Sequence, residues 1–227
     1  MDVSVAKLPV LRRLFRRIRR RRLKRFLEMI KPVPGETILD VGGTLPTWSL
    51  PETERLSAIL LNLGACRIPE NLQSRLQSAA GDATGLTYAD SEFKVVYSNS
   101  VIEHVGTYEN QVKMAGELRR VGQKLWVQTP AHCFIFEPHY IAPFIHWFPV
   151  PMRRLLVRRF TLWGLLNRPT KQEVEDQLQE LRLLTYKEMR ELFPDCRILR
   201  ERFLGMTKSY IAVRKECRRA VDSPSDS

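Results

Sequence analysis

Four short apolar segments in the first half of the sequence each run into polar or glycine residues. The residues at these ends are Asp40, Gly42 and Gly43, then Asn62, then Asp82 and Ala83, and finally Asn99. Segments that are apolar throughout predict strands of a parallel sheet, and such sheets bind ligands beyond the carboxyl ends of their strands. Asp40 and Asn62 stand 22 positions apart, which suits a glycine-rich first turn followed by a residue that binds ribose hydroxyls.

Each of these residues has a simpler interpretation when it is taken singly. A glycine pair after a strand is commonly a plain turn, Asp82 could cap a helix, and Asn99 could be a turn residue. Their joint placement at successive strand ends is what favours a ligand site over these local roles.

The elements that would position these residues follow one another in a regular order. Strands are expected at 37–41, 58–63, 76–80, 93–97 and 124–128, with a helix at 109–120. Thr185 and Glu188 have the spacing of a capping box, which predicts a further helix. Two segments, 197–203 and 209–214, are joined too closely for a parallel crossover and should pair antiparallel. The order predicts an α/β fold, a Rossmann-like three-layer sandwich whose mostly parallel seven-stranded sheet ends in a C-terminal antiparallel hairpin.

Residues 35–130 and 183–215 resemble the class I S-adenosylmethionine-dependent methyltransferases. The run ILDVGG at 38–43 looks like the first motif of that family, GDA at 81–83 like its adenine-contacting turn, and 93–105 like its fourth strand and following loop. The resemblance implies S-adenosyl-L-methionine as the cofactor. It further implies that Asp40, Gly42 and Gly43 border the methionine part, Asn62 binds the ribose, Asp82 and Ala83 hold the adenine, and Asn99 and His104 close the site toward the methyl acceptor.

Two departures from the family pattern concern this cofactor. The glycine loop of the family alternates as Gly-x-Gly-x-Gly, whereas Gly43 is followed here by Thr44, Leu45 and Pro46. The usual acid at the end of the second strand is replaced by Asn62, which lacks the charge-assisted bond to a hydroxyl. Both changes would weaken or alter cofactor binding, so a catalytically inactive, methyltransferase-like binding protein is one alternative function.

Residues 131–168 form an insertion after the fifth strand, and the run EPHY at 137–140 resembles the acceptor-side segment of bacterial members of the family. A hydroxyl acceptor needs a general base, and histidine is the side chain best suited to that role near neutral pH. His139 is the first candidate, with Glu137 as its orienting partner or as the base itself, and His132 and Tyr140 come next. The alternative is that Glu137 and His139 only fix a proline-rich loop.

The net charge of +12 is concentrated in residues 1–31, which hold twelve Lys and Arg against two acidic residues. Apolar residues recur at helical spacing over 8–30, which predicts a basic amphipathic helix ahead of a methyltransferase domain at 32–216. A second segment, 144–163, combines aromatic residues with arginines. Together the two segments indicate a surface for an anionic membrane. Nucleic acid is a less favoured partner because phosphate binding needs no apolar stripe, and a stripe that packs on the domain is the third interpretation.

The remaining composition limits the other classes of protein. The four cysteines are scattered, with no Cys-x-x-Cys pair or Cys/His cluster, so we expect neither a metal site nor a disulfide framework. No apolar run is long enough to span a bilayer, and residues 217–227 are predicted to form a disordered tail. The sequence therefore predicts a cytoplasmic enzyme, peripheral to the membrane, that methylates an oxygen of a small or lipid-linked acceptor. An RNA methyltransferase that uses the basic arm is the other alternative.

Overall fold

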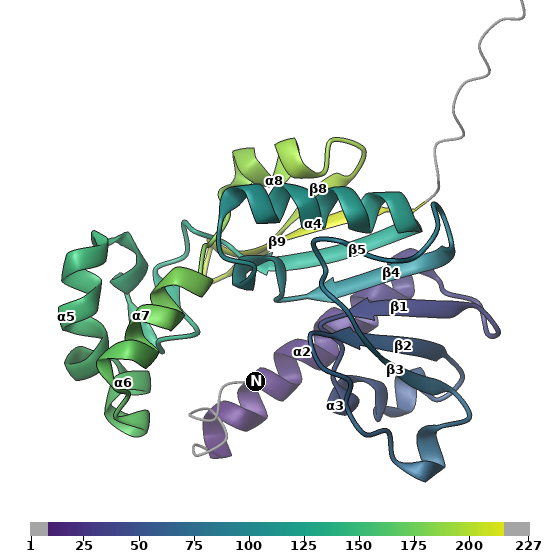
Figure 1. The fold of residues 1–227 in the computed structure, drawn as a ribbon, viewed down its shortest axis with the longest axis horizontal. Coiled ribbons are helices and arrows are strands. Elements are labelled where there is room, and N and C mark those ends of the chain that lie inside the picture. The colour runs from purple at the N-terminus through teal and green to yellow at the C-terminus, as the bar shows by residue number, and fades with distance from the viewer. Residues whose placement is uncertain (1–8, 216–227) are drawn as a thin grey trace, which may run out of the picture.

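The computed structural model describes residues 9–215, so the predicted tail at 217–227 and the first eight residues of the basic arm lie outside the described residues. A seven-stranded sheet runs in the order β3-β2-β1-β4-β5-β9-β8. Its strands are β1 (Thr37–Val41), β2 (Ser57–Asn62), β3 (Leu76–Ala80), β4 (Phe93–Asn99), β5 (Gly122–Pro130), β8 (Arg197–Phe203) and β9 (Met206–Arg214). The first five are parallel, and β9 is antiparallel to both of its neighbours. The predicted fold class is confirmed (Figure 1).

Helices cover both faces of this sheet. On one face, α4 (Tyr108–Val121) and α8 (Tyr186–Leu192) pack over a core that includes Leu39 and Val96. On the other face, α2 (Pro9–Ile30) and the short α3 (Leu45–Trp48) pack over Ile38 and Val95. Successive strand residues point to opposite faces, which is why neighbours in the sequence enter different cores. Within residues 9–215 the chain also forms four short 3-10 helices: η1 (Pro51–Thr53), η2 (Glu70–Leu72), η3 (Ile102–His104) and η4 (Ile145–Trp147).

The basic helix α2 is continuous, and its second half belongs to the core of the domain. Leu23, Phe26 and Ile30 are buried against the sheet. The ring of Phe26 lies 4.7 Å from that of Tyr97 and 5.9 Å from that of Trp126, both in edge-on contact. The interpretation in which the apolar stripe packs on the domain therefore holds for this half of the helix, and residue 31 is not a boundary between separate cores.

The insertion after β5 contains helices that the sequence analysis does not predict. It begins with a small hairpin, β6 (Phe136–Glu137) and β7 (Ala142–Pro143), and continues through α5 (Val150–Phe160) and α6 (Leu162–Asn167). With α7 (Lys171–Glu180) these elements enclose a small core of their own around Tyr140, Val157 and Trp163. In Figure 1 this group stands beyond one end of the sheet. Across residues 9–215, no helix is both long enough and apolar enough to cross a membrane.

Candidate active site

A cavity of about 850 Å³ opens at the carboxyl ends of β1 and β4. Five of the predicted site residues line it: Asp40, Gly42, Asn99, His104 and His139. The first four come from strand ends and the turns after them, as expected for a parallel sheet. The last comes from the insertion, so the cavity joins the predicted cofactor side to the predicted acceptor side.

The two glycines after β1 are required by close packing. Gly42 has a φ of +77°, and a side chain there would collide with Val101. A Cβ on Gly43 would lie 2.8 Å from Oδ2 of Asp40. The chain then enters α3 directly, and Thr44 and Thr47 line the cavity.

Asp40 lies beneath this turn with 2% of its surface exposed. The indole N–H of Trp48 donates to its Oδ2 at 2.6 Å. Burial nevertheless raises the pKa of this carboxyl to about 7, against the opposing effect of the bond from Trp48. The carboxylate therefore gains or loses its proton near neutral pH, and a neighbouring cation would favour its charged form.

Asn99 and Ser100 extend β4 into the cavity. The Oδ1 atom of Asn99 is buried and has no hydrogen-bond partner among the described residues. Ser100 adopts a φ of +59°, and its hydroxyl donates to Oε1 of Gln128 at 3.0 Å. The end of β4 thus places a buried oxygen acceptor on the strand next to the one that carries Asp40.

His139 is held from behind by Glu137. Its Nδ1 lies 2.6 Å from Oε1 of Glu137, which is fully buried, and the other carboxylate oxygen accepts from the backbone N–H of Tyr140 at 2.7 Å. A carboxylate bonded to Nδ1 fixes the ring orientation and makes Nε2 the basic nitrogen. The arrangement has the geometry of an oriented general base.

Glu103 and His104, from η3, stand beside His139. The rings of His104 and His139 are nearly perpendicular with centroids 4.7 Å apart, and burial lowers the pKa of His104 to about 4, with a further lowering when His139 is protonated. Glu103 is fully buried; its Oε2 accepts from Thr129 at 3.0 Å, and Oε1 has no partner among the described residues. One ligand atom from each of Glu103, His104 and His139 lies within 4.8 Å of the others, so these three could hold a metal ion. The sequence predicts no metal site, because its cysteines are scattered and His139 lies 35 positions after His104.

The other predicted cofactor residues lie outside the lining of the cavity. Asn62 donates through Nδ2 to the carbonyl of Gly43 at 3.1 Å, which ties the ends of β1 and β2 together. Asp82 is exposed, and its Oδ1 accepts from both the N–H and the hydroxyl of Thr84 at 2.8 Å. Ala83 packs on the sheet core. These contacts are local: Asn62 joins two strand ends, and Asp82 closes a turn with Thr84 where its alternative interpretation was a helix cap.

The lower-ranked residues of the insertion also lie away from the cavity lining. The carbonyl of His132 accepts from Nε2 of His146 at 2.9 Å and from the indole of Trp147 at 2.9 Å. Tyr140 is fully buried, with its ring 6.0 Å from that of Trp163. These contacts hold the insertion in place. Of the three histidines in this segment, His139 is the one that lines the cavity.

Three cationic residues that the sequence does not predict as site residues also line the cavity. They are Arg19, Arg22 and Lys208. Arg22 donates to Glu201, Gln128 and Ser209 at 2.9, 2.8 and 2.7 Å. A signal existed in the sequence, since Arg19 and Arg22 are three residues apart and so share a face of the predicted helix. What the sequence could not show is that this face turns toward the sheet.

No protein-family model matches the sequence, and no curated protein matches it significantly. Solved structures do match. A protein provisionally assigned as a Zn-dependent alcohol dehydrogenase from Rhodobacter sphaeroides has a TM-score of 0.59 at 16% identity, covering 88% of this chain and 90% of its own. Magnesium protoporphyrin IX methyltransferase from Synechocystis, solved with bound SAH, has a TM-score of 0.50 at 14% identity, covering 88% and 83%.

A third match is provisionally assigned as a methyltransferase from an antibiotic biosynthesis pathway, from Anabaena variabilis. It has a TM-score of 0.50 at 15% identity and covers 81% of this chain and 64% of its own. At identities this low, the structural similarity establishes the fold, and the chemistry has to be inferred from the residues of the site. The chain has the fold of the class I S-adenosylmethionine-dependent methyltransferases.

Proposed function

We propose that this protein transfers a methyl group from S-adenosylmethionine to an oxygen of a small or lipid-linked acceptor. The observation that carries the proposal is the single cavity that joins Asp40, Gly42 and Asn99 at the strand ends to His139 of the insertion. A methyl transfer needs cofactor and acceptor in one enclosed space, because alignment of the two reacting groups supplies much of the rate.

The residues at the strand ends fit the methionine part of the cofactor. An ammonium group would find the carboxylate of Asp40 and the unpartnered Oδ1 of Asn99 in the same cavity. Gly42 lines the same cavity, and its φ of +77° with Val101 packed against it holds the turn close to the site. When bound, the cofactor supplies a methyl group already activated by its sulfonium.

We assign the removal of the acceptor proton to His139. With Glu137 ionised, Nδ1 of His139 carries the proton and donates to it, so Nε2 takes the proton that an acceptor hydroxyl loses as its oxygen attacks the methyl carbon. His104 stays neutral near pH 7 because of its lowered pKa, so it adds no positive charge beside His139. The buried Glu137 then stabilises the imidazolium of His139 that forms.

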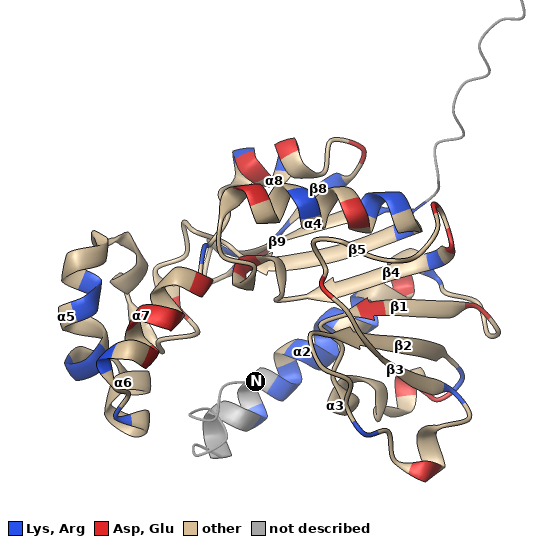
Figure 2. Cartoon of the chain, viewed as in Figure 1, with Lys and Arg blue, Asp and Glu red and all other residues tan. Residues whose placement is uncertain are grey.

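The location we propose is the surface of an anionic membrane, bound through the insertion. Leu155 and Phe160 of α5 are 67% and 71% exposed, and Leu165 of α6 is also exposed. Arg158 and Arg159, exposed on the same helix, supply the positive charge that anionic lipid headgroups attract (Figure 2). Exposed apolar side chains beside arginines are typical of a helix that lies in the headgroup region. On α2, Arg20, Arg21 and Lys24 are exposed beside the buried Leu23 and Phe26, so this half of the arm carries surface charge as well as core contacts.

Calorimetric titration of the full chain with S-adenosylmethionine and with S-adenosylhomocysteine tests the proposal. We expect both to bind with micromolar affinity, and we expect Asn99→Ala to weaken both while Asn71→Ala, exposed on η2 and outside the cavity lining, does not. If neither compound binds, the replacement of the glycine loop has removed the ligand, and the protein is a methyltransferase-like binding protein.

A further inference from the structure

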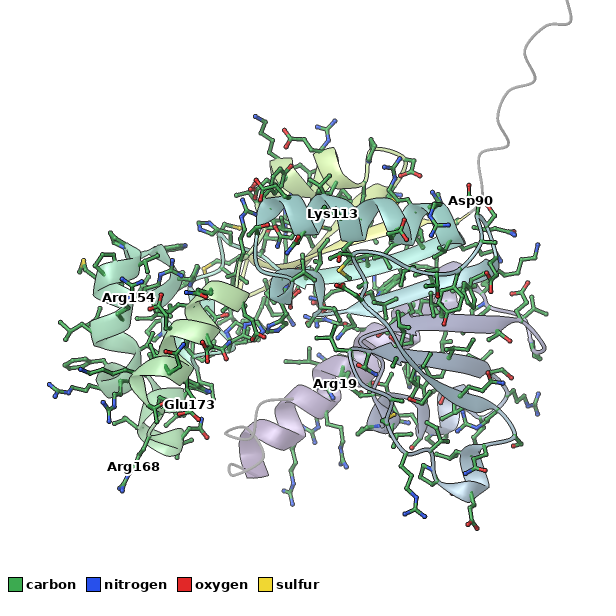
Figure 3. The ribbon with its side chains drawn as sticks, viewed as in Figure 1. Arg19, Asp90, Lys113, Arg154, Arg168 and Glu173 are labelled. Carbon is green, nitrogen blue, oxygen red and sulfur yellow. The ribbon has the colours of Figure 1, made fainter. Side chains whose placement is uncertain are left out.

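The cavity has a wall of three cationic side chains. Arg19 and Arg22 come from α2, and Lys208 comes from β9 (Arg19 is labelled in Figure 3). We call these three residues the cationic wall. The charge of Arg22 acts on both of the others, and together with burial it lowers the pKa of Arg19 and of Lys208. The three charges therefore lie close together in a partly buried place.

Few carboxylates offset these charges. Glu201 pairs with both Arg22, at 2.9 Å, and Lys208, at 3.5 Å. Arg19 makes no ion pair with any acidic residue in the described part of the chain. Two other acids line the cavity: Asp40, whose pKa is raised to about 7, and Glu180 on α7. The cationic wall keeps an excess of positive charge, and an anion bound there would offset the cost of burying it.

The neighbouring part of the cavity is apolar. Its side chains come from the insertion and from the hairpin of β8 and β9: Phe134, Ile135, Phe136, Ile141, Phe203 and Met206. We call these six residues the apolar wall. A pocket with a broad apolar surface and a few convergent charges selects a ligand that has both an apolar body and an acidic group.

We propose that the cavity binds an amphipathic anion, with its carboxylate or phosphate on the cationic wall and its apolar body against the apolar wall. The assignment of this anion as the methyl acceptor rests on the proposed function. The carboxylate of the cofactor is a second anion that the cationic wall would bind, because it has the same chemistry as the acidic group of the acceptor. Bidentate pairing with Arg19 serves either anion, so the two sources have to be separated by experiment.

The test uses the full chain and a fluorescent probe, dansyl-labelled undecanoic acid, with its neutral primary amide as the matched probe. Binding of each probe is measured in the absence of cofactor for the wild type, Arg19→Gln and Lys208→Gln. The control variant is Arg17→Gln, an exposed residue of the same helix that lies outside the cavity lining. Binding of S-adenosylhomocysteine is measured separately for every variant, and thermal melting confirms that each is folded.

We expect the acid to bind at least tenfold more tightly than the amide, and each cavity variant to reduce that preference about tenfold, as loss of a charge-assisted bond predicts. Arg17→Gln should leave the preference unchanged, and Arg19→Gln should leave the affinity for S-adenosylhomocysteine within about twofold. Equal binding of acid and amide would overturn the proposal. So would an Arg19→Gln variant that loses S-adenosylhomocysteine but keeps the acid, because its guanidinium would then belong to the cofactor. A wild type that prefers the acid but binds no cofactor supports the anion site and removes the methyl transfer.

Discussion

Oε1 of Glu137 and Nδ1 of His139 are 2.6 Å apart, and the carboxylate that fixes the imidazole is completely buried while the ring reaches the cavity. Glu137 and His139 therefore act together, and only the imidazole of His139 can contact a ligand in the cavity. Replacing His139 by Ala should lower the rate of methyl transfer about 10²- to 10⁴-fold, the usual loss for a general base. Glu137→Gln should lower it less, because the ring remains. Both rates are measured with saturating S-adenosylmethionine.

The affinity of these variants for S-adenosylmethionine should stay within about twofold of the wild type, which separates a role in proton transfer from a role in cofactor binding. Chelator treatment is the companion measurement, because His139 is also one of the three residues that could hold a metal ion. Loss of wild-type activity in chelator, with recovery on adding back a divalent ion, would contradict the general-base assignment.

Asp40 should make the stability of the fold fall as the pH rises. Its pKa is raised from 3.8 to about 7 by burial, so between these values the folded state binds a proton that the unfolded state has released. The contribution is fully present below about pH 4 and is lost above pH 7. Asp40→Asn should therefore gain stability relative to the wild type, by up to about 4 kcal/mol, between pH 4 and pH 8. Urea unfolding at both pH values measures the difference.

The matched control for that experiment is Asp82→Asn. The bonds from Thr84 lower the pKa of Asp82, so its contribution has the opposite sign and is lost as the pH falls below about 4. This variant should show no relative gain at pH 8. If Asp40→Asn gains no more than Asp82→Asn over the same range, Asp40 is not protonated in the folded state.

Phe26→Ala should destabilise the whole domain by about 3–5 kcal/mol, because it removes a buried ring that contacts Tyr97 and Trp126. Urea unfolding followed by tryptophan fluorescence measures the loss. Removing the arm through residue 31 should be at least as damaging, so such a truncation does not test membrane binding in isolation. An arm that could be deleted with no change in unfolding free energy would show that α2 is dispensable to the core.

Binding to anionic vesicles should depend on the exposed apolar residues of α5. The double variant Leu155→Ser/Phe160→Ser should bind phosphatidylserine-containing vesicles at least tenfold more weakly in a sedimentation assay, because two large apolar side chains no longer enter the headgroup region. Val112→Ser, on the half-exposed face of α4, is the control. Equal binding by the double variant and the control would remove α5 from the membrane surface.

The sheet could be predicted from the sequence because its central strands are buried on both faces and are therefore continuous apolar runs, as in β1 and β4. The insertion could not. Val157 is the one buried residue of α5, so the helix has too small an apolar face to produce a clear period. Thr170 and Glu173 form a capping box ahead of α7, the helix that follows the insertion. This capping box is the sequence signal that predicts α7.

The sequence predicted site residues where they follow strands and, through the resemblance of the EPHY run, at His139 in the insertion. Asp40, Gly42 and Asn99 reach the cavity because the carboxyl ends of β1 and β4 meet there. The position of Asn62 depends on a bond to the carbonyl of Gly43, which no spacing reveals. Arg19 was counted with the charges of the arm, because the side of the helix that meets the sheet is fixed by tertiary packing.

The contacts of Arg22 bear on when the protein becomes able to bind an acceptor. This guanidinium bonds to Glu201 and Ser209, which follow it by 179 and 187 positions. Contacts so distant in sequence form late, because a very long loop has to close first. The proposed anion site is therefore complete only when the last hairpin has joined the sheet.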